Sequence, residues 1–249
     1  MSYPHHPASS ERVFASVGPA RIGVGHRLVA RHGRTSTPEE FELLGLAWDL
    51  LPQVFAPAHT DSTELFTTWL PFPMGGSFLE VGCGAGVTAV MAARAGCAHV
   101  TAVDITPEAV RNTALNAQRH NLADRVVAVQ SDLYDALPPS ARFDLVFWNS
   151  NAIPAPREFV YARPLQHAIF DRDYAAHDRY LREGLARLTD GGRMFLGFNS
   201  LGDAPRLHAL AAESGVRLVE RRRMVRCAGD VPVTFQLLEA TPACDRQTA

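Results

Sequence analysis

The stretch SFLEVGCGAGVTAVMAARAGCAHVTAVD, residues 77–104, decides the fold. A short apolar run at 77–81 is typical of a buried strand, and the alanine-rich run at 87–95, which ends near Gly96, is typical of a helix. The next apolar run, HVTAVD at 99–104, predicts a second strand. A strand, a helix and a second strand in this order indicate a parallel sheet that carries helices on its faces.

The same alternation continues toward the carboxyl end of the chain. It predicts helices at 107–120, 171–188 and 206–214 and further strands at 126–130, 143–148, 193–198, 217–225 and 233–239. The last two strands have no helix between them, which predicts a hairpin and one antiparallel edge strand. We therefore expect an α/β fold with a doubly wound, mostly parallel sheet of seven strands.

Residues 1–70 lack this alternation, and they predict an N-terminal arm of helical pieces that acts as a lid. Thr37-Pro38-Glu39-Glu40 has the signature of a helix start, with a capping residue, a proline and acids in the first turn. The apolar residues behind it predict an amphipathic helix that continues to Leu51, and 63–70 predicts a second, shorter helix.

Residues 71–249 are then expected to form the main domain. This domain contains a long connection around 152–178, between the fourth and fifth strands. The connection is longer than most loops in compact domains, and its length favours a second lid over a plain link.

Composition excludes several classes of function. The net charge is −2, so no global field attracts nucleic acid, and no nucleic-acid partner is expected. All 24 basic residues are Arg, so the chain has neither a Schiff-base lysine nor a P-loop lysine. The four cysteines are widely spaced, and no metal is expected. Without an apolar run of about 18 residues or a signal-peptide pattern, we expect no membrane contact and a cytoplasmic location.

Three glycines mark a candidate ligand site. Gly82, Gly84 and Gly86 lie where the first strand turns into the first helix, where bare backbone can approach a ligand and present N–H groups. In a dinucleotide fingerprint the third glycine would fall one residue later, at Val87, so the spacing disfavours an NAD-dependent oxidoreductase. Asp104 ends the second strand, where a carboxylate accepts hydrogen bonds from ribose hydroxyls. The alternative role for Asp104 is a helix cap.

With Glu80–Gly86, Asp104 and Ser131-Asp132-Leu133, residues 77–150 resemble the class I S-adenosylmethionine (SAM)-dependent methyltransferases. The resemblance implies a Rossmann-like fold and SAM as the cofactor. It places Glu80 near the methionine amino group, Asp132 at the adenine amino group and the Leu133 amide at a ring nitrogen. The cofactor-binding residues that it implies are Thr63, Glu80, Gly82, Gly84, Gly86, Asp104, Ile105, Asp132, Leu133 and Asn149.

One group within this family is similar over a longer stretch. Residues 54–65 are similar to the segment that precedes the core in the small-domain methyltransferases, which act on release-factor glutamine or ribosomal-RNA guanine. Their fourth motif, Asn-Pro-Pro-Tyr, clamps a planar amide or amine. This sequence has Asn149-Ser150-Asn151-Ala152 instead, which keeps the Asn and lacks both prolines and the aromatic residue. That departure counts against planar-nitrogen chemistry.

Four residues are candidates for catalysis. Asn149 and Ser150 follow the fourth strand and Ser200 follows the fifth, at the edge where ligands bind in such sheets. Tyr174 lies in the long connection, where an aromatic ring could face the sulfonium of SAM. Turn formation is the alternative role for the Asn and Ser residues, and packing of the lid is the alternative for Tyr174.

Three functions remain in competition. The first expectation is a SAM-dependent methyltransferase that acts on a small molecule, in bacterial secondary metabolism. The alternative is a methyltransferase-like lyase that cyclises SAM to azetidine-2-carboxylate and releases methylthioadenosine, so that SAM alone is the substrate. A protein or RNA N-methyltransferase is the third and least favoured. The oligomeric state stays open between a monomer and a homodimer.

Overall fold

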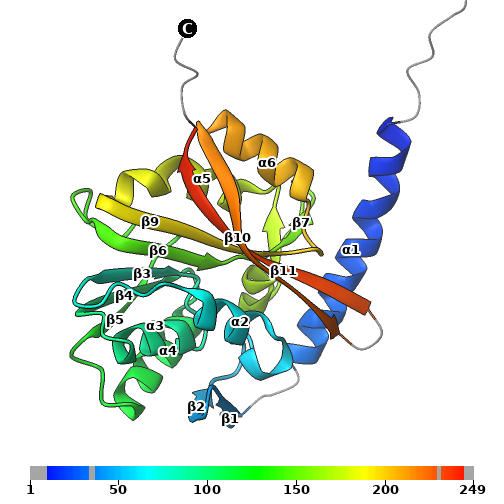
Figure 1. The fold of residues 1–249 in the computed structure, drawn as a ribbon. Helices are drawn as coiled ribbons and strands as arrows, with labels where there is room; N and C mark the ends of the chain where they lie inside the picture. The colour runs from blue at the N-terminus through cyan, green and yellow to red at the C-terminus, as the bar shows by residue number, and fades with distance from the viewer. Residues whose placement is uncertain (1–9, 34–36, 229–230, 244–249) are drawn as a thin grey trace, which may run out of the picture.

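The computed structural model describes residues 10–33, 37–228 and 231–243, and its centre is one seven-stranded sheet (Figure 1). The strand order is β10-β11-β9-β6-β3-β4-β5. The strands are β3 (Ser77–Val81), β4 (His99–Asp104), β5 (Val126–Gln130), β6 (Phe143–Asn149), β9 (Leu188–Asn199), β10 (Val216–Ala228) and β11 (Val231–Pro242). The doubly wound, mostly parallel sheet is therefore confirmed, and each strand lies within a few residues of its predicted range.

The sequence predicted that the antiparallel strand would lie at the edge of the sheet, and this prediction is wrong. β11 runs antiparallel both to β9 and to β10, so it lies between them, and β10 takes the edge. The hairpin was predicted correctly, but the order in which its two strands join the sheet is set by tertiary packing and not by the local pattern.

Helices cover both faces of the sheet. The helices α2 (Ser62–Trp69), α3 (Val87–Arg94) and α4 (Pro107–Arg119) lie on one face, and α5 (Ala175–Gly184) and α6 (Ala204–Glu213) lie on the other (Figure 1). Alternate residues of each strand supply the two cores: Phe78 packs beneath α2 and α3, whereas Leu79 packs on the side of α5.

The helix predicted over 37–51 is wrong. That segment forms a hairpin of β1 (Glu39–Leu43) and β2 (Leu46–Leu50), joined at Leu44 and Gly45, which have φ values of 53° and 71°. Positive φ at both central residues is the geometry of a tight hairpin turn. Buried Asn112 and Asn116 of α4 bind the backbone of this hairpin, which fixes it to the domain.

The N-terminal arm closes over the long connection. α1 (Ser10–His32) contacts β7 (Ile153–Ala155) and η2 (Pro164–Ala168), and the predicted arm residues 1–9 lie outside the described part of the chain. A third small core joins α1 to the connection through Val29, Ile153, Leu165 and Phe170. The division into an arm at 1–70 and a main domain at 71–249 stays a prediction.

The connection itself has more structure than a loop. It contains β7, η2 and the short strand β8 (Phe170–Arg172), which pairs in parallel with β7. The helix predicted from 171 begins only at Ala175, because Asp173 and Tyr174 have positive φ and so cannot continue a helix. None of the described helices has the length and apolar character needed to cross a membrane.

Candidate functional site

A cavity of about 540 Å³ lies at the carboxyl ends of β3, β4, β5 and β6. This is the edge at which open α/β sheets bind ligands, and the volume lies in the ordinary range for small-molecule sites. Distant segments close the remaining sides: α1, the segment before α2, the connection 152–178 and the β10–β11 hairpin.

The glycine turn forms the floor of the cavity. Gly82, Gly84 and Gly86 all have positive φ, of 65°, 53° and 79°. A Cβ at Gly84 would meet no atom within 4 Å, so bare backbone faces the open cavity there, whereas a Cβ at Gly86 would lie 2.8 Å from the Thr113 backbone of α4. Gly84 therefore leaves room for a ligand, and Gly86 allows α4 to pack closely.

Glu80 is a buried acid in the cavity wall. Its side chain is almost fully buried, and its Oε2 finds no hydrogen-bond partner among the described residues. Burial raises the pKa of Glu80 to about 8, and hydrogen bonds from Thr88 and Ala89 offset part of this rise. A buried carboxyl with an unused oxygen requires a partner. The ammonium group of SAM fits this requirement.

Asp104 lies beside the glycine turn and is held in place by it. Its Oδ2 accepts a hydrogen bond from Gly84 N at 3.1 Å, and its Oδ1 accepts from the N and Oγ1 of Thr106, both at 2.9 Å. Burial raises the pKa of Asp104. These contacts use both acceptor sites of Oδ1 and leave one on Oδ2 for a ligand hydroxyl. The residue that caps α4 is Thr106, whose Oγ1 accepts from Ala109 N, so Asp104 supports the cap and is not itself the cap.

Three of the residues predicted to bind the cofactor, Ile105, Asp132 and Leu133, lie together at the ends of β4 and β5. Ile105 lines the cavity with an unusually exposed apolar side chain, and Leu133, with a φ of 50°, lines it next to Asp132. The Asp132 side chain is 52% exposed, and its Oδ2 lies 3.3 Å from Arg179 Nη1. An apolar side chain beside an acid suits the face and amino edge of a purine.

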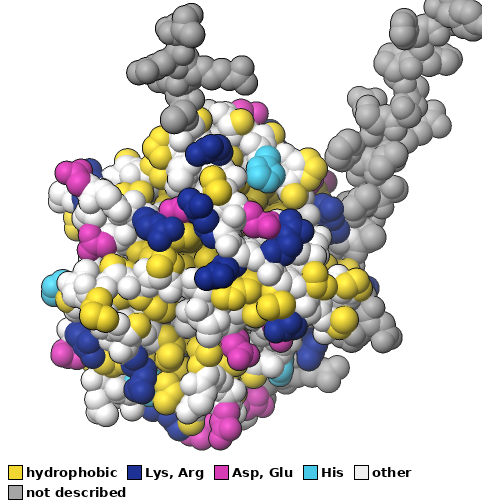
Figure 2. All heavy atoms as spheres, viewed as in Figure 1, with side chains coloured by type: hydrophobic (Ala, Val, Ile, Leu, Met, Phe, Trp, Pro, Cys, Tyr) yellow, Lys and Arg dark blue, Asp and Glu magenta, His cyan; other side chains and the backbone are white. Residues whose placement is uncertain are grey.

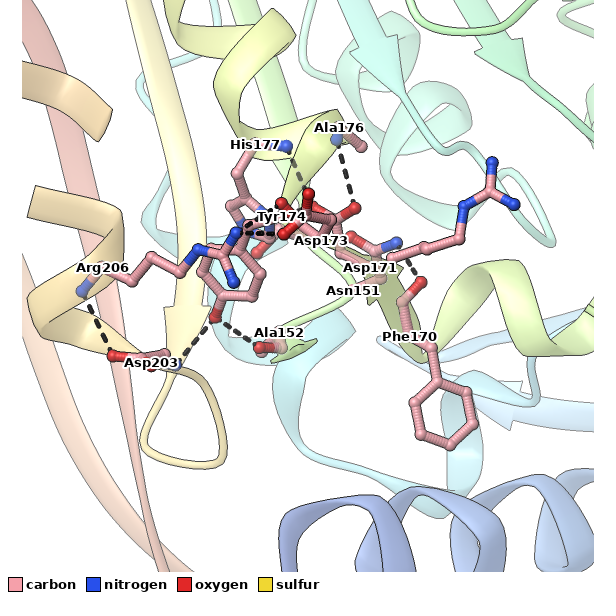
Figure 3. Close-up of polar contacts among 12 residues, drawn as sticks. Asn151, Ala152, Phe170, Asp171, Asp173, Tyr174, Ala176, His177, Asp203 and Arg206 are labelled. Carbon is pink, nitrogen blue, oxygen red and sulfur yellow. Dashed lines mark hydrogen bonds and ion pairs between the residues drawn. The ribbon is translucent and has the colours of Figure 1, made fainter. Parts of the chain in front are cut away.

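Asn149 and its neighbours end β6 at the cavity. Asn149 Nδ2 donates to Ser62 Oγ at 3.4 Å, and Thr63 lines the cavity beside Ser62. Ser150 also lines the cavity, but its Oγ donates to Gly197 O at 3.0 Å, so its hydroxyl ties β6 to β9. Asn151 Nδ2 donates to Phe170 O at 2.7 Å, which ties the same turn to β8 (Figure 3).

Two predicted catalytic residues are not brought to the cavity. Tyr174 is fully buried, and its hydroxyl donates to Ala152 O and accepts from Asp203 N, both at 2.7 Å (Figure 3). Ser200 Oγ accepts from Thr234 N at 3.0 Å and thereby pairs with β11. Neither residue lines the cavity. The catalytic interpretation of both is therefore corrected to a structural one.

The sequence pattern missed a buried pair at the cavity. Asp171 lines the cavity, and its Oδ2 lies 2.7 Å from His177 Nδ1, while its two oxygens also accept from Ala176 N and His177 N (Figure 3). These contacts cap the first turn of α5. The pair was missed because the sequence predicts a helix that already begins at Asp171, where a capping role is not expected.

Comparison with known proteins identifies relatives of this chain. A family model described as a methyltransferase domain matches residues 78–163. The release factor glutamine methyltransferase of Bordetella pertussis is 32% identical over 193 residues, which are 73% of this chain and 70% of that protein. The ribosomal RNA small subunit methyltransferase C of Chromohalobacter salexigens is 30% identical over 221 residues, or 81% of this chain and 60% of that protein.

Solved structures agree on the fold. The 16S rRNA N2 G1207 methyltransferase of T. thermophilus, in complex with AdoMet and guanosine, superposes with a TM-score of 0.55 at 21% identity, over 82% of this chain and 51% of that one. Against most of the curated relatives that it matches, this chain spans between 24% and 60% of their length.

These similarities correct two expectations. The relatives are named as methyltransferases of a release factor, a ribosomal protein and ribosomal RNA, which are macromolecules. The expectation of a small-molecule acceptor is therefore wrong, and none of these relatives is named for the cyclisation of SAM. The expectation that no nucleic acid is a partner is also wrong, because two of the similar proteins are named as ribosomal RNA methyltransferases. That expectation relied on the net charge of the whole chain. A net charge does not report how arginines are distributed around one cavity.

Proposed function

This chain belongs to the class I SAM-dependent methyltransferases, and we propose that it transfers the methyl group of SAM to a nitrogen atom of a macromolecule of the translation machinery. The relatives with the broadest coverage support a translation substrate. We propose nitrogen as the methylated atom because Asn149, the retained residue of the fourth motif, faces the cavity from the end of β6. We expect the chain to act in the cytoplasm, where ribosomes and release factors work.

Each part of SAM would meet different residues of the cavity. Glu80 would pair with the ammonium group, Asp104 would accept from a ribose hydroxyl through Oδ2, and the backbone at Gly84 leaves space beside them. Ile105 and Leu133 would contact the faces of adenine, with Asp132 at its amino edge. SAM supplies a methyl group that is already activated by the sulfonium, so the protein mainly has to position the acceptor and exclude water.

Asn149 would position that acceptor. Its Nδ2 donates to Ser62 Oγ, while its Oδ1 accepts no hydrogen bond from the described part of the chain. An amide oxygen held in this way can accept from an acceptor N–H and so aim the nitrogen lone pair along the line of attack. As the nitrogen bonds to the methyl carbon, the carbon–sulfur bond of SAM breaks and S-adenosylhomocysteine leaves; the N–H proton then passes from the nitrogen to water.

The missing prolines of the fourth motif have a local substitute. Ser150 is bound to Gly197 O and Asn151 is bound to Phe170 O, so two hydrogen bonds fix the turn that two prolines would stiffen. For the missing aromatic residue, Tyr161 lines the cavity with its ring stacked on His167 at 3.8 Å between centroids. These contacts support planar-nitrogen chemistry despite the changed motif.

The proposal can be tested with candidate acceptors supplied separately. The enzyme is incubated with isotope-labelled SAM and either ribosomal subunits, extracted ribosomal RNA or a release factor, and nucleosides and peptides are examined by mass spectrometry. We expect a methylated nitrogen in one macromolecule, together with S-adenosylhomocysteine. Production of S-adenosylhomocysteine with a small metabolite and with none of the macromolecules would refute the proposal.

A further inference from the structure

Three exposed arginines, Arg31, Arg172 and Arg226, line the cavity, and a fourth, Arg222, lies on the same face of β10 as Arg226; we refer to these four as the basic rim. Arg31 comes from α1, Arg172 from β8 and Arg226 from β10, and all three line the cavity. Segments far apart in the sequence therefore converge to place positive charge at one opening.

Arg222 extends the rim along the edge strand. Side chains two residues apart on a strand share a face, so Arg222, Met224 and Arg226 point to the same side of β10. Their register partners on β11 are Leu237, Phe235 and Val233. Phe235 and Val233 also line the cavity, which shows that this is the face that leads to its mouth.

The arginines of the basic rim have no acidic partner in the described part of the chain. Elsewhere the arginines of this protein are commonly neutralised: Arg179 pairs with Asp132 and Asp135, and Arg193 and Arg221 share Glu239. Unpaired guanidinium groups that face solvent are free to bind an anion.

The acids near the mouth do not cancel this charge. Asp132 is paired with Arg179, and Asp171 is held by His177 and two backbone amides. Glu80 is buried in the cavity wall with a raised pKa, and Asp104 accepts hydrogen bonds from Gly84 and Thr106. Asp61 is the remaining acid among the described residues that line the cavity. Figure 2 shows dark blue side chains gathered across the face that β10 and β11 form, with magenta ones between them.

From this arrangement we propose that the basic rim binds the phosphates of a single-stranded RNA segment whose target base enters the cavity. This inference rests on the proposed function, and it names RNA as the class of macromolecule. A guanidinium matches a phosphate with two parallel hydrogen bonds and can also stack on a base. A base that has left its stack fits a cavity of this size better than a folded protein surface does.

Binding of a fluorescein-labelled single-stranded RNA of about 12 nucleotides, measured by anisotropy in the presence of S-adenosylhomocysteine, tests the proposal. The salt concentration is varied between about 50 and 200 mM. Arg222→Gln and Arg226→Gln should each raise the Kd about fivefold and reduce the slope of log Kd against log salt by about 0.7, the value for one lost phosphate contact on a single strand.

Arg142→Gln is the matched control. Arg142 is exposed, has no acidic partner in the described residues, and precedes β6 at the edge of the sheet opposite the cavity. This variant should bind the RNA like the wild type. An unchanged Kd in the Arg222→Gln/Arg226→Gln double variant would overturn the proposal, and so would equal competition by an oligoglutamate peptide, which would indicate an acidic protein instead.

The outcomes separate this inference from the proposed function. If the wild type binds RNA through the basic rim but methylates no macromolecule, the surface stands and the proposed function fails. If the enzyme methylates a release factor at the same rate in the wild type and the double variant, the proposed function stands and the RNA surface fails.

Discussion

The protonation of Glu80 affects the stability of the fold, and the same side chain is proposed to bind SAM. Because burial raises its pKa from 4.5 to about 8, the folded chain binds a proton that the unfolded chain releases. The stability that comes from this proton is fully present below pH 4.5 and is lost as the pH rises toward about 8. A neutral residue at this position would not lose it.

We therefore expect Glu80→Gln to be more stable than the wild type at high pH and to bind SAM more weakly. Without SAM, its melting temperature should exceed that of the wild type at about pH 9, and the difference should shrink at about pH 6. Calorimetry should show SAM affinity reduced by roughly 1.5–3 kcal/mol, as is typical for loss of a charged hydrogen bond. A melting-temperature difference that does not change with pH would contradict the buried, protonated state of Glu80.

Asn149 can be tested independently of cofactor binding. Asn149→Ala should lower turnover at least ~100-fold, about 2.7 kcal/mol of transition-state stabilisation, because the acceptor nitrogen loses the group that orients it. SAM affinity should fall much less, since Glu80 and Asp104 carry those contacts. Ser200→Ala is the control, because Ser200 pairs with β11 outside the cavity and should turn over like the wild type. If Asn149→Ala turned over at the wild-type rate, the acceptor nitrogen would be positioned by a residue other than Asn149.

At the scale of elements, the sequence predicted what depends on neighbouring residues. Glu80 and Asp104 lie at the carboxyl ends of strands and the glycine turn follows one directly, so their place at the carboxyl edge of the sheet could be inferred from the order of strands. The hairpin at 39–50 could not be inferred from the sequence, because Thr37-Pro38-Glu39-Glu40 satisfies the rules for a helix start. The decisive features there are the positive φ values at Leu44 and Gly45 and the contacts with α4.

The walls of the cavity were predicted less well than its floor. Arg31 and Arg226 reach the same opening from the two ends of the chain, and no local pattern reports such a closure. Tyr174 failed as a catalytic candidate for a similar reason, since its positive φ turns the side chain into the core between Ala152 and Asp203. The sequence of the connection 152–178 shows which residue types are present, but it does not indicate which of them point into the cavity and which point into the core.

The start of α5 depends on Asp171 and can be tested as an element. Asp171→Asn keeps one acceptor oxygen but loses the negative charge next to His177 Nδ1 and the backbone amides of Ala176 and His177. We expect a loss of about 1–3 kcal/mol and a melting temperature lower by several degrees. Asp178→Asn, on the same helix but in an exposed pair with Arg182, should melt like the wild type. Equal melting temperatures for all three proteins would show that Asp171 does not hold α5.

At the scale of the whole molecule, α1 determines how closed the cavity is. Leu28 and Arg31 of α1 line the cavity, and Gly25, one helical turn before Leu28, packs directly on the ring of Phe170. A Cβ at Gly25 would lie 2.3 Å from that ring, which is fully buried and cannot move aside easily. The absence of a side chain at Gly25 therefore allows the arm to dock on the lid.

Two glycines of α1 give a matched test of this docking. Ala is favoured over Gly in a helix by about 1 kcal/mol, so Gly23→Ala, whose Cβ would lie 3.6 Å from its nearest neighbour, Arg27, should stabilise α1. Gly25→Ala gains the same propensity but forces α1 away from Phe170. We expect hydrogen exchange over 22–32 to slow in Gly23→Ala and to accelerate in Gly25→Ala, with S-adenosylhomocysteine binding weakened only in the second variant. Tighter binding and slower exchange in both variants would mean that α1 behaves as an independent helix and that the cavity closes without it.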